Sequence, residues 1–316
     1  MIQLRRIFAV SAFLVGLGGL AGTGWTHSVV VISADTLTST ARTINGAKAV
    51  IFADQPDATV SELVLDINPQ HRQFQLDSIR LLKPDILLTI GSAATRIARD
   101  NFLNTPIVFS SVMYPVISGF VKSMNTPGGH VTGASLTIAA DVQFKYFRRI
   151  VPKLKYLGVL YSDNTASLIP PAKVIAGELG IKLVALRVGN DKELPAALDS
   201  LVNRCDGLWS IADPNLFSPQ STSYILLHAI RSGKPFMGFS RNVVESGALF
   251  ALDFDYKAIG RQAGNMVNQI AKGARPAEIP VSTPDVIWFH YNELTAKHLR
   301  ISIPADLVAV AKEVYR

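Results

Sequence analysis

The chain has 316 residues, of which 48% are hydrophobic and 17% are charged, and this balance excludes an intrinsically disordered protein. The length is sufficient for two domains of ordinary size. The 31 Lys and Arg residues outnumber the 24 Asp and Glu residues and give a formal net charge of +7.

The N-terminal segment has the features of an export signal. Arg5 and Arg6 precede a mostly apolar run over 7–21, and small residues follow at Gly22–Gly24. The apolar run is shorter than the roughly 20 residues that a membrane span needs. We therefore expect a cleaved signal peptide over residues 1–26 and a periplasmic mature protein, with an uncleaved anchor as the alternative.

Buried strands alternate with helices along the rest of the chain. In the first half we expect strands at 29–33, 63–67, 85–92, 106–110 and 130–135, and helices at 36–47, 69–82, 92–102, 116–123 and 141–151. In the second half we expect strands at 156–161, 182–187, 206–213, 234–240 and 247–252, and helices at 169–179, 192–202 and 256–272. Asn45-Gly46 is expected to end the first helix or form a turn. This alternation predicts a parallel α/β fold.

Two segments of the chain, 85–110 and 206–240, echo one another. Each has a buried strand ending in small polar residues, then a helix, then a second buried strand ending in serine. Such a unit belongs to a parallel sheet, and ligands of parallel sheets lie beyond the carboxyl ends of the strands. Two copies predict two Rossmann-like, parallel-sheet lobes that share a cleft and clamp a small molecule.

The chain is expected to cross between these lobes three times. We assign 28–134 plus 246–283 to lobe 1, and 136–243 plus 285–316 to lobe 2. The strand at 247–252 is given to lobe 1 because no partner for it remains in lobe 2. Three crossings would form a multi-strand hinge that permits closure around a ligand.

Polar residues at the predicted strand ends are the candidate ligand contacts. Ser92 and Thr95 lie at a helix start, where free N–H groups favour an anion, although Ser92 could equally be an ordinary N-cap. Asp213 holds the corresponding place in lobe 2, where it could face an ammonium group or cap a helix. Asp255 is expected to cap the helix at 256–272. Further candidates at strand ends are Ser110, Ser111, Tyr114, Asn164, Ser167, Asn215 and Ser240.

Catalytic motifs are missing from the sequence. It has no Gly-x-Ser-x-Gly elbow, Walker loop or dinucleotide-binding turn, and its six histidines lack metal-ligand spacing. Cys205 is the only cysteine, which excludes an intramolecular disulfide, and a buried position fits it better than a nucleophilic role. Trp209 could wall the cleft or lie in the core. We expect no enzyme activity, no cofactor and no metal.

The basic stretch Lys145–Lys155 raises the question of a nucleic-acid partner. An exported protein meets little nucleic acid, so the solvated face of a helix is the better interpretation, with a docking surface for a membrane partner as the alternative. We therefore expect no nucleic-acid partner.

Several motifs occur in an order that resembles a known family. They are Lys83–Thr95, Thr105–Phe109, Gly119–Ser123, Pro127–Gly133, Gly260–Val267, Gly273–Ala277 and Leu294–Lys297. Over residues 69–316 the chain resembles the ABC-transporter substrate-binding family related to tryptophan/tyrosine-binding lipoproteins. The resemblance implies a type I periplasmic-binding-protein fold, no catalysis, and a small ligand, often an aromatic amino acid, in the interlobe cleft. It also implies an ABC permease of the inner membrane as partner.

The resemblance also assigns ligand-facing positions. By position these are Ser92, Ala93, Thr95, Ser110, Ser111, Ser167, Asp213 and Asp255. Tyr114-Pro115 stands where the family usually has Asp-Pro, which removes an acid that could bind an ammonium group. The leading hypothesis is a periplasmic solute receptor of an ABC importer. The alternatives are a ligand-sensing subunit for a membrane histidine kinase or chemoreceptor and, third, an enzyme.

Overall fold

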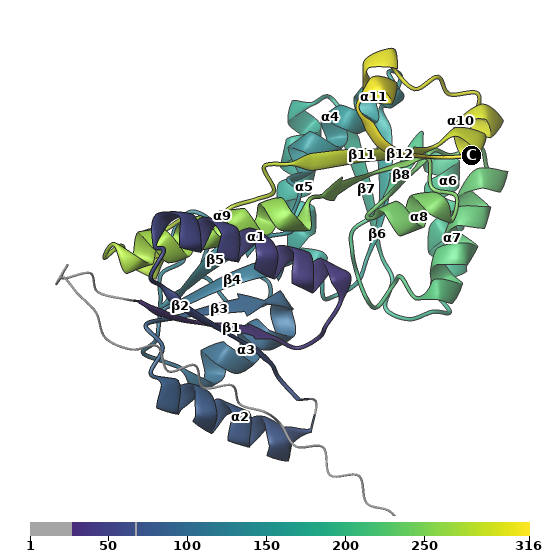
Figure 1. Cartoon of the computed structure of the whole chain (residues 1–316). Coiled ribbons are helices and arrows are strands. Elements are labelled where there is room, and N and C mark those ends of the chain that lie inside the picture. Colours follow the sequence, from purple (N-terminus) through teal and green to yellow (C-terminus); the bar gives the residue numbers. More distant parts are fainter. Residues whose placement is uncertain (1–26, 67) are drawn as a thin grey trace, which may run out of the picture.

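A computed structural model of the protein describes residues 27–66 and 68–316 and shows two lobes side by side (Figure 1). The expected signal peptide over 1–26 lies outside the described residues. Within them, the structure has no helix that could cross a membrane.

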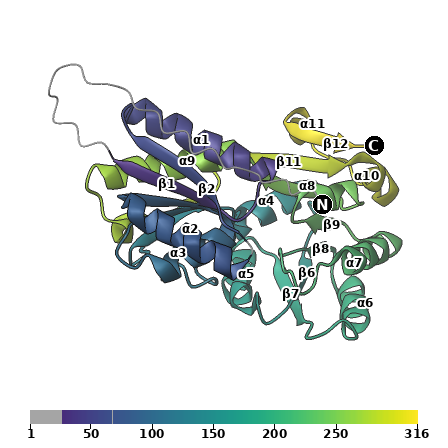
Figure 2. The ribbon, with the colours of Figure 1, turned by 60° about the horizontal axis from the view of Figure 1, so that its bottom comes forward.

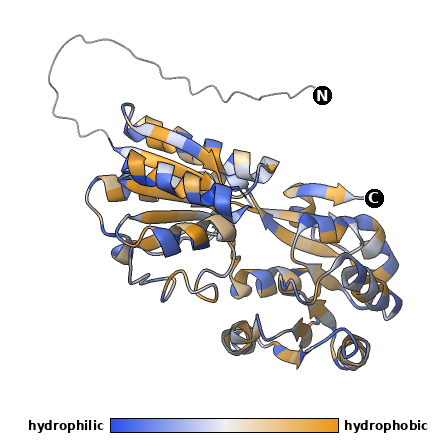
Figure 3. Ribbon diagram, turned by 90° about the horizontal axis from the view of Figure 1, so that it is seen from below, coloured by the Kyte–Doolittle hydropathy of each residue, from blue (hydrophilic) through white to orange (hydrophobic). Residues whose placement is uncertain are grey.

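The first lobe is built on a parallel sheet. Its strands, in spatial order, are β2 (Thr59–Val64), β1 (Ser28–Ser33), β3 (Ile86–Ile90), β4 (Ile107–Val112) and β5 (Val131–Ser135). Four helices cover it: α1 (Thr38–Asp54), α9 (Tyr256–Ala271), α2 (Pro69–Leu82) and α3 (Gly91–Asn101). Alternate residues of β1 enter separate cores, with Val29 and Val31 on the α1–α9 side and Val30 and Ile32 on the α2–α3 side. This two-sided burial explains the continuous apolar runs of the strands, seen as orange ribbons in Figure 3.

The second lobe holds a larger sheet. Its strands, in spatial order, are β12 (Ala311–Tyr315), β11 (Ile287–Asn292), β10 (Phe250–Phe254), β9 (Phe236–Gly238), β8 (Gly207–Trp209), β6 (Tyr156–Tyr161) and β7 (Lys182–Arg187). The helices of this lobe are α4 (Ala140–Ile150), η1 (Ala166–Leu168), α5 (Ile169–Glu178), α6 (Leu194–Arg204), α7 (Pro219–Arg231), α8 (Arg241–Glu245), α10 (Glu293–Leu299) and α11 (Ala305–Ala309). Neighbouring strands are parallel except β10 and β11, which are antiparallel.

In the described part of the chain, three segments join the lobes. Residues 136–139 lead from β5 to α4, Asp255 separates β10 from α9, and residues 279–286 run from η2 (Pro276–Glu278) back to β11. The last segment pairs with the first, because Ser135 N–H donates to the Ser282 carbonyl at 2.9 Å and Ser282 N–H donates to the Gly133 carbonyl at 3.1 Å. The lobes are therefore linked by neighbouring strand-like segments.

The two echoed segments form the units that the sequence predicts. The helix α3 links β3 to β4, α7 links β8 to β9, and both strand pairs are parallel. The predicted fold class, two Rossmann-like parallel-sheet lobes with a multi-strand hinge, is confirmed in its two-lobed α/β architecture. The antiparallel strand β11 is the exception to parallel pairing, because the chain re-enters lobe 2 beside the point where β10 leaves it: Phe254 pairs with Ile287.

The assignment of 246–283 to lobe 1 is wrong for its strand. Phe250 and Ala251 of β10 pair with Met237 and Gly238 of β9 in the second sheet, whose outer edge was available. Only the helical part, α9, packs on the first lobe. The short helix α8 is enough to connect the two neighbouring strands.

Two local predictions are also wrong. Asn45-Gly46 does not end the first helix, which continues to Asp54. Gly46 instead permits close packing against α9, because a Cβ there would lie 2.1 Å from the Lys257 carbonyl oxygen. Figures 1 and 2 both show α1 and α9 side by side. The expected helix at 116–123 is a series of turns and bends.

Candidate ligand site

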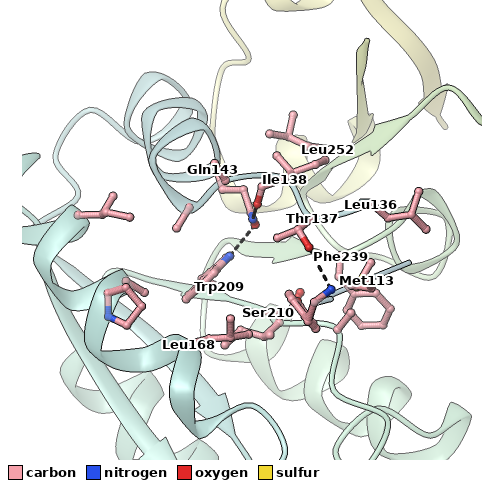
Figure 4. Close-up of a pocket in the computed structure, with 18 of the residues that line it drawn as sticks. Met113, Leu136, Thr137, Ile138, Gln143, Leu168, Trp209, Ser210, Phe239 and Leu252 are labelled. Atoms are coloured by element: carbon pink, nitrogen blue, oxygen red, sulfur yellow. Dashed lines mark hydrogen bonds between the residues drawn. The ribbon is translucent and has the colours of Figure 1, made fainter. Parts of the chain in front are cut away.

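A cavity of about 390 Å³ lies between the lobes, next to the crossing segments. It falls in the range of roughly 300–1,000 Å³ that is usual for small-molecule pockets. Figure 4 shows its walls: the loop after β4 carries Met113, the first crossing carries Leu136 and Ile138, and the second lobe supplies Leu168 and Trp209. Most of the lining side chains are apolar or aromatic.

Trp209 forms one wall and is 5% exposed. Its Nε1 donates to Gln143 Oε1 at 2.7 Å, and its ring meets the Phe144 ring edge-to-face at 4.8 Å between centroids. Gln143 is itself held, because its Nε2 donates to the Ile138 carbonyl at 2.7 Å. The sequence allowed Trp209 to lie either in the cleft or in the core. In the structure it is buried and also forms part of the cavity wall.

The loop after β4 has an unusual backbone. The strand has a bulge between Ser110 and Val112, and Ser111 and Tyr114 have φ angles of 60° and 52°. Non-glycine residues in this left-handed region are uncommon and are enriched at functional sites. The Tyr114 N–H donates to Thr137 Oγ1 at 3.1 Å, which fixes this loop against the first crossing (Figure 4).

The Tyr114 side chain comes from the first lobe and meets the second lobe at the cavity. It lines the cavity close enough to Ala212 for the backbone of that residue to affect its pKa. Burial is the largest effect on this group and raises the pKa of Tyr114 to about 12; the backbone of Ala212 opposes the rise, and the charge of Asp213 adds to it. The phenol is therefore neutral at physiological pH.

The predicted residues at the start of α3 lie away from this cavity lining. Thr95 is fully buried, and its Oγ1 lies 2.9 Å from Thr89 Oγ1 and donates to the Gly91 carbonyl at 2.8 Å. Ser92 is half-buried and Ala93 is exposed. Ser92 is not the N-cap, since Ile90 holds that position without a side-chain bond.

The predicted serines of β4 also lie outside the lining. Ser110 is fully buried, and its Oγ has no hydrogen-bond partner among the described residues. Ser111 is half-buried, and its Oγ lies 3.2 Å from Thr43 Oγ1 of α1. Neither serine is among the residues that line this cavity, and a ligand contact for them stays a prediction.

Asp213 is 1% exposed and is surrounded by donors. Its Oδ2 accepts from Ser162 N–H at 3.0 Å, Ser162 Oγ at 2.7 Å and Thr165 Oγ1 at 2.6 Å, while its Oδ1 accepts from Asn215 N–H at 3.0 Å. The N-cap of α7 is Ser218, so Asp213 caps no helix. The carboxylate instead fastens the loop after β6 to the loop after β8.

The other predicted residues of the second lobe and the late helix are not among those lining the cavity. Asn164, Ser167 and Asn215 are exposed, and Ser240 is the half-buried N-cap of α8. Asp255 is the N-cap of α9 as expected, because its side chain accepts from Lys257 N–H at 2.9 Å. Of the twelve predicted residues, Tyr114 is the one that lines the cavity.

Sequence reasoning missed the apolar part of the site. It concentrated on polar strand ends, whereas the first crossing at 136–139, the start of α4 at Ala140 and the inner face of α5 form much of the wall. A signal was present: Leu136-Thr-Ile-Ala-Ala140 continues apolar after β5 has ended, where a solvated linker would be polar.

The family model for ABC transporter substrate-binding proteins matches residues 70–315. The chain belongs to the ABC transporter substrate-binding protein family. A curated relative, the "Tyrosine-binding protein" of Clostridioides difficile, is 28% identical to this family member over 234 residues, covering 73% of this chain and 67% of the relative.

Solved structures share the fold of this substrate-binding protein. An ABC domain from Streptococcus pneumoniae in complex with L-Trp aligns with a TM-score of 0.65 at 21% identity, covering 92% of this chain and all of the other. A ligand-free, open substrate-binding protein with adhesive properties from Clostridium difficile aligns with a TM-score of 0.72 at 21% identity, covering 92% and 99%. These likenesses support the two-lobed fold.

Proposed function

We propose that this family member is the solute receptor of an ABC importer and that its lobes close on a small molecule. The observation that carries the proposal is the apolar cavity between two lobes that three segments join. Because crossing segments line the cavity, a rotation of one lobe relative to the other would change its shape directly. Hinged closure around a ligand is a common use of this architecture.

The cavity walls favour a ligand with an aromatic or otherwise apolar body. Trp209, Phe239 and Phe254 contribute aromatic surface, and burial of apolar surface would supply most of the affinity. Aromatic amino acids and related metabolites have such a body. The printed names of the relatives, tyrosine-binding and L-Trp-bound, are consistent with this class.

The importer role requires export and a partner. We propose that the mature protein is periplasmic, that residues 1–26 are removed as a signal peptide, and that the loaded receptor delivers its ligand to an ABC permease in the inner membrane. Mass spectrometry of the secreted protein would locate the mature N-terminus.

Closure can be tested with a metabolite library. A ligand should raise the melting temperature and reduce the radius of gyration measured by small-angle X-ray scattering, because closure brings the lobes together. No change in either quantity across the library would contradict the proposal. Ligand uptake should also fall when the gene is deleted; normal uptake with loss of a ligand-induced response would favour the sensing role instead.

A further inference from the structure

We propose that the ligand is an uncharged, largely apolar molecule rather than a zwitterionic amino acid. This inference rests on the proposed receptor function and narrows the class of ligand. It is carried by the chemistry of the cavity wall and of the groups directly behind it.

The wall offers no formal charge. Among the described residues that line the cavity there is no Asp, Glu, Lys, Arg or His. The polar side chains in the wall are Tyr114, Thr137, Gln143 and Ser210. A charged group that entered this space would leave water without meeting an opposite charge, which is strongly unfavourable.

The polar side chains of the wall already have partners within the protein. Gln143 uses its oxygen for Trp209 and its nitrogen for the Ile138 carbonyl. Thr137 Oγ1 accepts from the Tyr114 N–H and from Ser135 Oγ, at 3.1 and 2.9 Å. Ser210 Oγ donates to the Met237 carbonyl at 2.7 Å. The wall therefore has little capacity to replace the hydration shell of an ammonium or a carboxylate group.

Two groups near the wall could be suspected of binding an ammonium ion, and neither is suited to it. Asp213 follows the wall residue Ala212, but both of its carboxylate oxygens accept hydrogen bonds from the protein and it is 1% exposed. Tyr114 lines the wall as an uncharged phenol, because burial raises its pKa to about 12. An ammonium group at this wall would have to compete with the donors that already surround Asp213.

An uncharged ligand needs none of these changes. An aromatic ring could pack against Trp209, Phe239 and the apolar face of α5, and a single hydroxyl or ring N–H would find enough polar atoms at the edge of the wall. The chemistry therefore fits indole-like or phenol-like molecules that lack the charged amino-acid backbone.

The test compares ligands that share a ring and differ in charge. Isothermal titration calorimetry would measure L-tryptophan against 3-methylindole, and L-tyrosine against 4-methylphenol. We expect each neutral compound to bind at least about tenfold more tightly than its amino acid, a ratio equivalent to about 1.4 kcal/mol. Tryptamine and indole-3-acetate, which carry one charge each, should also bind more weakly than 3-methylindole.

A pair of variants on α5 would test whether the ligand binds in this cavity. Ala172→Leu fills space in the wall, whereas Val174→Leu lengthens an exposed side chain of the same helix by one methylene group. Binding of 3-methylindole should fall at least about tenfold in the first variant and stay within about twofold in the second. Circular dichroism and melting curves would verify that both variants are folded.

Each outcome bears on one of the two proposals. Tighter binding of L-tryptophan or L-tyrosine than of the neutral partners would overturn the uncharged-ligand proposal while leaving the receptor function intact. Equal binding of 3-methylindole to both α5 variants would overturn it as well, because the binding would then lie outside the cavity. Failure of every library compound to close the lobes would overturn the receptor function itself.

Discussion

The two echoed strand ends, at β3 and at β8, perform different tasks despite their similar sequences. After β3 the helix α3 begins at once, at Gly91, and none of its first-turn residues reaches the interlobe cavity. After β8 the chain runs through a loop from Ser210 to Ser218 before α7 begins, and the first residues of that loop form part of the cavity wall. The second lobe therefore shapes the site at this position, and the first lobe does not.

The difference arises from how each end holds its polar groups. In the first lobe the helix follows the strand directly, and the neutral hydroxyl of Thr95 contacts Thr89 of β3 and donates to the Gly91 carbonyl. In the second lobe the loop is longer, and the buried carboxylate of Asp213 stabilises it by accepting four hydrogen bonds from Ser162, Thr165 and Asn215. A small polar residue at a strand end can therefore form internal hydrogen bonds that stabilise a loop, and its presence alone does not indicate a ligand contact.

Loss of the carboxylate at the second strand end should have the largest effect. Asp213→Ala would leave the donors of Ser162, Thr165 and Asn215 without their acceptor in a buried place, and should lower the free energy of unfolding by about 4 kcal/mol. Urea denaturation would measure this. The matched control is Asp163→Ala in the same region, since Asp163 is fully exposed and pairs with Arg187; its effect should be small. Equal effects of the two variants would contradict the fastening role.

The next effect concerns the helix pair that covers the first lobe. Gly260→Ala would place a Cβ 2.0 Å from the Thr43 carbonyl oxygen and should cost about 3 kcal/mol, because the backbones of α9 and α1 would have to separate. Thermal and urea unfolding would measure the loss. Gly177→Ala is the control: it lies in α5 with nothing within 4 Å of the added methyl group, and should raise stability by roughly 0.5–1 kcal/mol.

The first strand end should respond more weakly than the second. Thr95→Val keeps the shape of the side chain but removes the hydroxyl that contacts Thr89 and the Gly91 carbonyl, and should cost about 1 kcal/mol in unfolding free energy. Ligand affinity should be unchanged, since Thr95 does not line the cavity. A loss of affinity with normal stability would instead make this end part of the binding site, as the sequence suggested.

The smallest expected effect is a pH dependence of stability that arises from His290 on β11. The strand pair β11–β12 has no counterpart in the first sheet. Burial is the largest cause that lowers the pKa of His290, and Arg241 and Lys312 also lower it, while Asp253 and Glu313 oppose them. Because the folded pKa lies below the ordinary value of 6.5, the unfolded chain binds more protons as the pH falls through 6.5, and stability decreases there. The slope from one group is at most about 1.4 kcal/mol per pH unit.

His290→Leu should flatten this dependence. Neither ring nitrogen has a hydrogen-bond partner among the described residues, although Nδ1 lies 3.5 Å from Glu313 Oε2, so the substitution removes the titration together with this one contact. Urea midpoints at pH 7.5, 6.5 and 5.5 would show the change. Some slope should remain, because the pKa of His130 is also lowered, by burial and by Arg99. The lowered pKa of Glu313 acts only near and below its ordinary value of 4.5. An unchanged slope in the variant would rule out His290 as its source.

Most of the architecture could be predicted from the sequence because its signals are local. The strands β6 and β7 and the helix α2 begin and end at the residues expected from the sequence, 156–161, 182–187 and 69–82. The lobe membership of β10 could not be predicted in the same way, because it depends on which sheet edge is free in three dimensions. The prediction of a helix end at Gly46 was wrong for a related reason. The close contact that requires a glycine there is with Lys257 of α9, far along the chain.

The site was harder to predict than the fold. Polar residues at strand ends are visible in the sequence, but their hydrogen-bond partners are not, so the internal roles of Thr95 and Asp213 could not be distinguished from ligand contacts. Tyr114, which lies two residues beyond the end of β4, was among the predicted residues and lines the cavity. The apolar wall combines the first crossing with α5 and β8, and only the folded chain brings these segments together.

The position of Asp255 has a mechanical consequence. It is the single residue between Phe254, which is fixed in the second sheet, and Tyr256, the first residue of a helix locked onto α1 by glycine contacts. Because both neighbours belong to packed elements, a reorientation of the lobes would act on this crossing mainly through the backbone angles of Asp255, while the crossings at 136–139 and 279–286 would have to turn with it. Asp255→Pro would fix one of these two backbone angles, and we expect it to reduce any ligand-induced change in the radius of gyration.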